Sequence, residues 1–237
     1  MKNLRLISFW LLLTMSMATV VFNACGDDEK DEQKKENPSD PTNPNQGIGP
    51  ATSTTDPGII INGVRWATRN VDAPGTFADT PESPNMFYQW NSKIGWSRNE
   101  PLIPSDGTST WNSSWNGNGA TTWEKTNDPC PSGWRMPTLS ELNALVSSGS
   151  VWTTVNSMNG LKFGSGSSTL FLPAAGSRRY SEGKLINVGL YGNYWSSTGT
   201  QNGSNLAYNF SFGSYGVSIG NVSVTYSVGQ SCRCVSE

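Results

Sequence analysis

The residues in this 237-residue sequence best suited to chemistry are four cysteines, because the chain contains no histidine. Without an imidazole, serine–histidine and cysteine–histidine catalysis are excluded, and the commonest metal ligand is missing. An enzyme built on this chain would have to work through carboxylates, lysine, tyrosine or cysteine. In an exported protein, the three cysteines at Cys130, Cys232 and Cys234 would allow one disulfide and one free thiol.

The fourth cysteine, Cys25, follows a segment with the layout of an export signal. Lys2 and Arg5 give a basic start, residues 6–22 are an almost uncharged apolar run, and a small residue precedes the cysteine. This arrangement resembles a bacterial lipobox, in which the cysteine is lipidated. We expect residues 1–24 to be a lipoprotein signal peptide and Cys25 to carry a lipid that attaches the protein to the membrane. The alternative is an ordinary cleaved signal with an incidental cysteine.

Residues 25–58 are expected to form the lipidated anchor and a disordered tether. Their dense charge, followed by Pro, Asn, Ser and Thr, cannot bury enough apolar surface to fold. The acidic run Asp27, Asp28 and Glu29 resembles the export signal of surface lipoproteins in Bacteroidetes-type bacteria. We therefore expect an outer-membrane, lipid-anchored protein exposed at the cell surface. The alternative is that the acidic run is only a solvated charge cluster. The protein could then face the periplasm instead of the cell surface.

Residues 59–237 are long enough for one domain with a sizeable core. They contain 11 basic and 10 acidic residues, so the net negative charge of the chain comes from the tether. Nucleic acid is not an expected partner, because its recognition requires a basic patch. The abundance of Trp, Gly, Asn, Ser and Thr, with little Leu or Ala, indicates a loop-rich domain that is mainly β.

The local patterns predict short strands and one helix. Residues 58–71 read as two strands around the Asn62-Gly63 turn. Thr138 and Glu141 have capping-box spacing, which predicts a helix over about 138–148. Beyond it, alternating apolar residues predict further strands. No helix–strand alternation of the βαβ type occurs, so the expected fold class is α+β with antiparallel β-sheets and long loops. The apolar face of the helix would consist of Leu139, Leu142, Leu145 and Val146.

The polar stretch 92–128 is the strongest candidate for a binding region. Exposed indole faces can stack on sugar rings or on partner side chains, and neighbouring Asn, Ser and Thr supply hydrogen bonds. Long loops on a rigid scaffold often carry binding sites. The alternative is that these tryptophans fold back and cover the core. The candidate ligand-binding residues are Trp96, Trp111, Trp115 and Trp123.

The same stretch contains oxygen ligands of the kind that calcium requires. They show no fixed ligand pattern, although a calcium site needs several converging oxygens. We therefore expect no cofactor and no metal, with calcium as the weaker alternative. The residues concerned are Glu100, Asp106, Asn112 and Asn116.

Several phrases occur in an order that carries a family resemblance. They are GVRWATRNV, YQW, DPCPSGWRMPT, LSEL, LPAAGSR, YWSST, AYNFSF and CRCV, between about Gly63 and Val235. This region resembles the Fibrobacter succinogenes major paralogous domain family, whose members are exported, often lipid-anchored bacterial proteins. The resemblance implies a fold similar to C-type lectins and to the formylglycine-generating enzyme. Members of the family mostly lack an assigned activity.

The resemblance favours a non-catalytic domain that binds a ligand, either a glycan or a protein at the cell surface. The first alternative is a structural or accessory subunit of a surface fibre or adhesion assembly. The second is an enzyme related to the formylglycine-generating type, in which Cys232 and Cys234 would form a catalytic pair. A single residue between these thiols does not reproduce a known catalytic spacing, and no histidine is available to lower a thiol pKa.

The resemblance also implies how the cysteines pair. The family's end usually reads Ser-Val-Arg-Cys-Val, whereas residues 231–235 here read Ser-Cys-Arg-Cys-Val. Cys234 takes the position of the family's cysteine, and Cys232 replaces an apolar residue. Geometry alone is consistent with either partner for Cys130. On the resemblance we expect a Cys130–Cys234 disulfide and a buried Cys232 thiol.

Residues 128–142 would then be a structural joint between the tryptophan-rich stretch and the last strand. Trp134 is expected in the core, and Thr138 and Glu141 would start the helix. The forked donors of Arg135 would hold carbonyls or a carboxylate, with anion binding as the functional alternative. Farther along, the tandem Arg178-Arg179 is expected to be solvated or internally paired.

Overall fold

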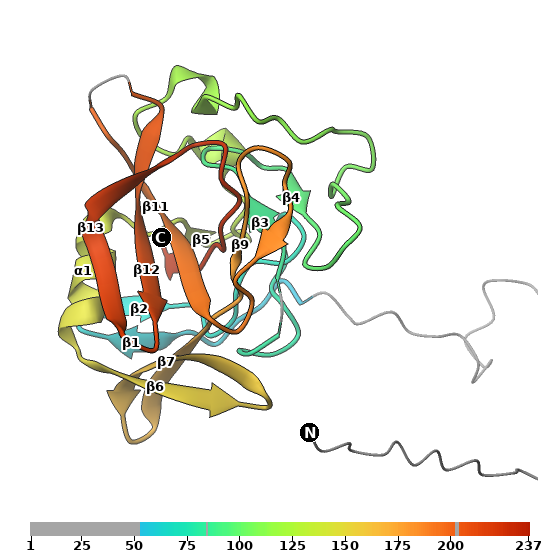
Figure 1. Ribbon diagram of the computed structural model, residues 1–237. Helices are drawn as coiled ribbons and strands as arrows, with labels where there is room; N and C mark the ends of the chain where they lie inside the picture. Colours follow the sequence, from blue (N-terminus) through green and yellow to red (C-terminus); the bar gives the residue numbers. More distant parts are fainter. Residues whose placement is uncertain (1–52, 84, 202–203) are drawn as a thin grey trace, which may run out of the picture. The chain divides into compact units, whose positions relative to one another are not determined.

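The computed structural model describes residues 53–83, 85–201 and 204–237 (Figure 1). The expected signal peptide (1–24), the lipidation site Cys25 and residues 26–52 of the expected tether lie outside the described residues. Within the described part of the chain, no helix combines the length and the apolar character needed to cross a membrane.

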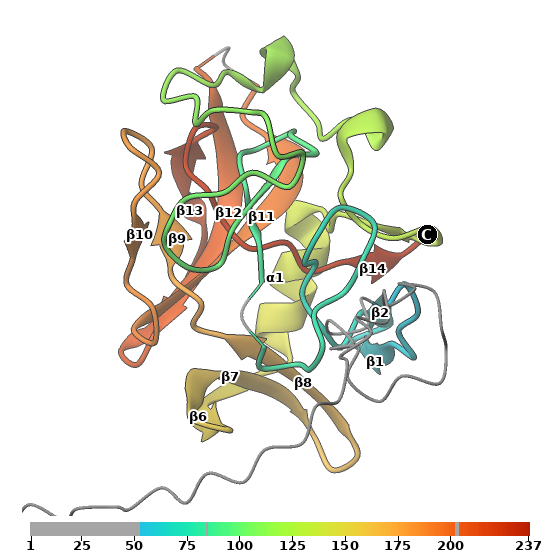
Figure 2. The same ribbon diagram turned by 90° about the vertical axis from the view of Figure 1, so that its right-hand side faces the viewer.

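Short antiparallel strands form most of the regular secondary structure of the domain (Figures 1 and 2). One sheet has the strand order β1 (Ile59–Ile61), β2 (Val64–Trp66), β14 (Val235–Ser236) and β5 (Trp134–Arg135). A second consists of β6 (Ser150–Val155), β7 (Met158–Ser165) and β8 (Ser168–Pro173). A third consists of β11 (Tyr191–Gly199), β12 (Leu206–Gly213) and β13 (Gly216–Thr225). Two strand pairs join β3 (Phe87–Tyr88) with β4 (Gly95–Trp96), and β9 (Ser177–Arg178) with β10 (Leu185–Ile186).

All pairings between these strands are antiparallel, which confirms the coarse fold class of antiparallel sheets with one short helix. The predicted hairpin at the start of the domain is also confirmed. Ile61 of β1 pairs with Val64 of β2 across the turn. Asn62 and Gly63 adopt φ values of 46° and 79°, the left-handed conformation that a tight two-residue hairpin turn requires.

The predicted helix is α1 (Leu139–Ser147), and both of its ends follow from the sequence. The Thr138 side chain accepts from the backbone N–H of Glu141 at 3.2 Å, and the Glu141 carboxylate accepts from the backbone N–H of Thr138 at 2.8 Å. This reciprocal capping box satisfies donors that the first turn leaves unpaired. The helix ends shortly before Gly149. This glycine has a φ of +78°, which is a left-handed conformation and cannot continue a right-handed helix.

Two apolar clusters form the core. The first is aliphatic and phenylalanine-rich: Leu142 and Leu145 of α1 pack there with residues of β7, β8, β11 and β12. Figure 2 shows α1 beside the β11–β12–β13 sheet. The second cluster is rich in indole rings and contains Trp90, Trp123, Trp134 and Trp195. Many of its members come from segments between the named strands. Large aromatic side chains therefore form the core where the chain has little regular secondary structure.

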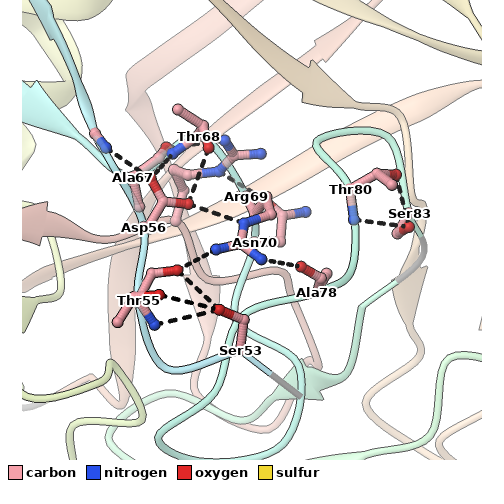
Figure 3. A network of polar contacts seen from close by, with 12 residues as sticks. Ser53, Thr55, Asp56, Ala67, Thr68, Arg69, Asn70, Ala78, Thr80 and Ser83 are labelled. Atoms are coloured by element: carbon pink, nitrogen blue, oxygen red, sulfur yellow. Dashed lines mark hydrogen bonds and ion pairs between the residues drawn. The ribbon is translucent and has the colours of Figure 1, made fainter. Parts of the chain in front are cut away.

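A polar network fixes the chain where it enters the domain (Figure 3). The Asp56 carboxylate accepts hydrogen bonds from the backbone N–H of Gly58 at 2.8 Å and from the hydroxyl of Thr68 at 2.9 Å, and it pairs with the Arg69 Nε at 3.1 Å. Burial by itself raises the pKa of Asp56, but these hydrogen bonds outweigh it and leave the pKa below its ordinary value. Residues 53–58, which the sequence assigns to the tether, therefore contact the domain.

Candidate functional site

The joint predicted around Cys130 is present. Cys130 and Cys234 form a disulfide with a Cα–Cα distance of 6.0 Å, which confirms the expected pairing. Cys232 is a free, buried thiol. Burial raises its pKa well above the ordinary value, and the nearby Asp128 carboxylate raises it further. A neutral thiol without solvent access is a poor nucleophile, so the geometry gives no support to a catalytic Cys232/Cys234 pair.

Arg135 and Trp134 carry out the structural tasks that the sequence suggests. Arg135 donates to both carboxylate oxygens of Glu141, at 2.9 and 2.6 Å. Trp134 is buried and packs edge-on against Phe77, with ring centroids 5.7 Å apart. Burial opposes ionisation of Glu141, but the bonds from Arg135 and Thr138 lower its pKa overall. The guanidinium thus binds an internal carboxylate and is not a free anion site.

Three of the four candidate tryptophans surround one cleft of about 540 Å³. These are Trp96, Trp111 and Trp115, which come from β4 and from the loop that follows it. In Figure 1 the green segment that carries them lies beside β3, β4 and β9. The other lining residues are uncharged: Gln89, Ser92, Ile94, Thr108, Ser109, Thr110 and Asn112. The cleft thus combines indole rings with hydroxyl and amide groups, which suits a neutral polar ligand.

Each indole is held by a different part of the scaffold. Trp96 sits on β4, where it pairs with Phe87 of β3 and is 2% exposed. Trp111 is half-buried, and its indole N–H donates to the backbone carbonyl of Tyr180 at 2.8 Å. Trp115 is also half-buried, and its indole N–H donates to the carbonyl of Trp90 at 2.7 Å. The hydrogen bonds of Trp111 and Trp115 fix the ring orientation while part of each ring stays exposed.

The Trp111 ring packs closely against Trp96 and against the backbone at Gly183 and Gly229. Its ring meets Trp96 edge-on, with centroids 5.1 Å apart. A Cβ added at Gly183 would fall 2.8 Å from Trp111, and one at Gly229 would fall 3.1 Å away. Both positions therefore need glycine for the indole to pack as it does, and Gly183 also has a φ of +69°.

The loop that carries Trp111 is fastened on either side of the tryptophan. The Gln89 amide donates to the backbone carbonyls of Asn112 at 2.7 Å and Ser227 at 2.9 Å, which ties the loop to the C-terminal segment. Asp106 accepts from the backbone N–H of Thr108 at 3.1 Å and of Ser109 at 3.0 Å. Hydrogen bonds from Ser109 and Thr108 lower the pKa of Asp106. A cleft built on a loop is thus held in a defined shape.

Among the fully buried polar side-chain atoms of the cleft residues, one has no partner in the described part of the chain. It is the buried indole Nε1 of Trp96. Most buried indole N–H groups find a hydrogen-bond acceptor, so an unsatisfied one beside a cleft stands out. Trp66, in the aliphatic core, carries the other fully buried indole nitrogen without a partner among the described residues.

The fourth candidate, Trp123, does not join the cleft. It is buried against Trp90, with ring centroids 5.8 Å apart, and its indole N–H donates to the carbonyl of Asn127 at 2.9 Å. The backbone N–H of Trp123 also bonds the carbonyl of Ser197 on β11. Trp123 therefore follows the alternative raised for the whole stretch, in which the tryptophans cover the core.

The four residues considered for calcium each have a separate local role. The Glu100 carboxylate accepts from the backbone N–H of Leu185 at 3.0 Å and from Arg178 at 3.2 Å. Asp106 caps its own turn, and the Asn112 and Asn116 side chains each accept from a backbone N–H two residues on. Within the described residues, no three His, Cys, Asp or Glu side chains gather as a metal site would require.

Two arginines are buried: Arg178, which the sequence predicts to be solvated or internally paired, and Arg233, to which the sequence assigns no role. Arg178 is fully buried and donates to the backbone carbonyls of Ser97 and Asn99, holding the loop after Trp96, whereas Arg179 is exposed. Arg233 donates to the Asn70 side chain at 2.7 Å, and burial lowers its pKa to about 10. For Arg233 the available signal was its position between Cys232 and Cys234, because an arginine among core residues must find internal acceptors.

Comparisons with known proteins identify no relative. No family model matches the chain, and neither a curated protein nor a solved structure matches it.

Proposed function

We propose that this protein is a non-catalytic, lipid-anchored cell-surface protein whose domain binds a glycan in the aromatic cleft. The observation that carries the proposal is the gathering of Trp96, Trp111 and Trp115 around one cleft with an uncharged polar lining. Indole faces stack on the apolar faces of sugar rings, and hydroxyl and amide groups bind sugar hydroxyls. A glycan is favoured over a protein because a concave cleft lined by indole rings, hydroxyls and amides matches the apolar faces and the hydroxyl groups of a sugar.

The remaining parts of the proposal rest on the sequence. The lipid on Cys25 would attach the protein to the outer membrane, and the stretch up to residue 52 would hold the domain away from it. The C-type-lectin-like fold and membership of the Fibrobacter succinogenes major paralogous domain family remain proposals. They are supported by the ordered sequence phrases and by a domain that combines small antiparallel sheets, one short helix and long loops.

A glycan-binding screen of the purified full-length protein tests the proposal. Trp111→Ala and Trp115→Ala should each weaken the detected binding by roughly five- to 150-fold, because each removes a stacking surface worth about 1–3 kcal/mol. Tyr215→Ala is the matched control, since Tyr215 is 100% exposed and lies outside the cleft. Unchanged binding in both tryptophan variants, with folding verified by thermal melting, would show that the cleft is not the glycan site.

The structure offers one observation in favour of the alternative, a subunit of a surface assembly. Strand β6 (Ser150–Val155) forms an edge of its sheet and pairs only with β7 among the named strands. Its sequence, SVWTTV, contains no charge, proline or glycine, so it lacks common devices that protect an edge from pairing with another chain. Thr153→Lys should abolish assembly and spare glycan binding if this alternative holds. Light scattering with and without the substitution distinguishes the two functions.

A further inference from the structure

A second cavity, of about 240 Å³, shares no lining residue with the aromatic cleft. Its walls come from the β9–β10 hairpin, from β11, β12 and β13, and from the segment that precedes Ser231. Its size is below the range typical for drug-sized ligands, so it suits one small group or ring.

Two buried amides form the floor of this cavity. Asn209 is 5% exposed and Gln230 is 1% exposed. The Asn209 Nδ2 donates to the Gln230 Oε1 at 3.0 Å. The Asn209 Oδ1 and the Gln230 Nε2 have no hydrogen-bond partner among the described residues, and neither is a fully buried atom. If both amides were flipped, one acceptor and one donor would still remain open side by side.

The backbone holds these amides in place. Gln230 and Tyr88 exchange two backbone hydrogen bonds, at 3.0 and 2.9 Å. Asn209 lies in the β11–β12 ladder opposite Trp195. A donor and an acceptor fixed in this way bind a complementary group without first losing much conformational freedom.

Three aliphatic side chains also line the cavity, together with Ser177, Arg178 and Asn193, and the cavity reaches the surface. The aliphatic side chains are those of Ile186, Val224 and Val228. Tyr180, which is 54% exposed, and the exposed Arg179 stand among its lining residues and mark its opening. The cavity therefore leads from an exposed aromatic ring to a donor–acceptor pair beside branched aliphatic side chains.

We propose that this cavity binds the acetamido group of an N-acetylated sugar. The acetamido N–H would donate to the Asn209 Oδ1, and its carbonyl would accept from the Gln230 Nε2. The methyl group would contact Val224 and Val228, and the sugar ring would lie toward Tyr180. A secondary amide satisfies both open groups at once, and buried polar groups without partners are costly to leave unpaired. This site is separate from the aromatic cleft and does not depend on the function proposed for it.

Saturation-transfer NMR of the purified full-length protein with N-acetylglucosamine tests the proposal, and glucose serves as the probe that lacks the acetamido group. The acetyl methyl protons should receive the strongest saturation. For so small a ligand, the Kd should be on the order of millimolar. Glucose should bind at least tenfold more weakly. Equal binding of the two sugars, or binding of neither, overturns the proposal and assigns the two amides to bound water.

Two variants localise the binding. Gln230→Glu keeps the shape of the side chain and the oxygen that accepts from Asn209 but removes the open donor, so binding should fall at least tenfold. Val228→Phe fills the cavity without altering the amides and should have the same effect, provided that melting curves show a folded protein. Tyr215→Ala, at an exposed residue that lines neither cavity, is the control and should leave N-acetylglucosamine binding unchanged. If Trp115→Ala abolishes binding and the two cavity variants do not, the sugar binds in the aromatic cleft and the cavity proposal is wrong.

Discussion

The joint around Cys130 and the aromatic cleft use similar residue types but satisfy their polar groups in opposite ways. In the joint, the Asp128 carboxylate accepts from the backbone N–H groups of Cys130 at 2.9 Å and Met136 at 3.0 Å. Arg135 and Glu141 bind one another through two hydrogen bonds. The charged side chains of the joint are thus bound internally, and none is directed at a ligand.

In the cleft, internal bonds fix the frame and leave the lining groups free to bind. The indole N–H groups of Trp111 and Trp115 donate to backbone carbonyls, and Gln89 anchors the loop. The hydroxyl of Thr110 has no such role in the described contacts, and part of the Trp111 and Trp115 rings stays exposed. The role of a tryptophan therefore depends on what surrounds its ring. Trp134 is buried in the core, and the guanidinium of Arg65 lies over its ring. Trp111 is only half-buried and lines a cleft.

Removing the disulfide should have the largest effect on stability. The residues joined by Cys130–Cys234 are 104 apart in sequence. The double substitution Cys130→Ala/Cys234→Ala should reduce the free energy of unfolding by about 4–5 kcal/mol, because it frees a long loop of the unfolded chain. Urea denaturation measures the loss. Cys232→Ala is the matched control, and an equal loss in that variant would contradict the assigned role of the joint.

Conservative substitutions of two tryptophans should separate core from cleft. Trp90 is fully buried, stacks on Tyr226 at 4.2 Å and donates to the Ser196 carbonyl. Trp90→Phe should cost about 3 kcal/mol, since it leaves a cavity and an unpaired carbonyl. Trp111→Phe should cost about 1 kcal/mol, because its ring is only half-buried. Equal losses in urea denaturation would mean that Trp111 is a core residue.

Glu141→Gln should weaken the joint in a pH-dependent way. At pH 7 the loss should be about 1 kcal/mol and should come mainly from the partly exposed ion pair with Arg135, because glutamine can still close the capping box. The folded-state pKa of Glu141 is lowered, so its stabilising contribution is present above the unfolded-state pKa. That contribution disappears as the pH falls through the folded-state pKa. Unfolding free energies measured from pH 7 to pH 3 should therefore converge for parent and variant, and parallel curves would contradict this account.

The smallest expected effect is that of salt concentration on the Kd of glycan binding in the cleft, which should be nearly absent. The lining residues carry no charge, so there is little electrostatic attraction for ions to screen. The Kd should change less than about twofold between low and high sodium chloride, since a screened charge pair is not involved. Calorimetric titrations at the two salt concentrations measure this. A tenfold weakening at high salt would indicate charged ligands that the cleft geometry does not explain.

The sequence predicts the joint well because its signals are local. The Asn62-Gly63 turn, the capping box at Thr138 and the stop at Gly149 each depend on a few neighbouring residues. The disulfide was predicted through the family resemblance and not through geometry, because residues 130 and 234 are brought together only by the folded chain.

The cleft is predicted only in part because it depends on distant contacts. The sequence places Trp96, Trp111 and Trp115 on one excursion, but it cannot show that Tyr180 and Gly229 hold Trp111. The burial of Trp123 also depends on a distant contact, because its indole packs against Trp90 in the core. The amides Asn209 and Gln230 carry no sequence signal at all, since they meet across two separate segments.

The most direct test of the account is an NMR titration that follows the tryptophan indole N–H signals. Maltohexaose, cellohexaose and triacetylchitotriose would be added in turn to the full-length protein, with signals assigned by single Trp→Phe substitutions. The account predicts that at least one of these neutral saccharides shifts the signals of Trp111 and Trp115 saturably and leaves that of Trp134 unchanged. If none of them shifts the cleft signals, or if Trp134 responds equally, the aromatic cleft is not a saccharide site.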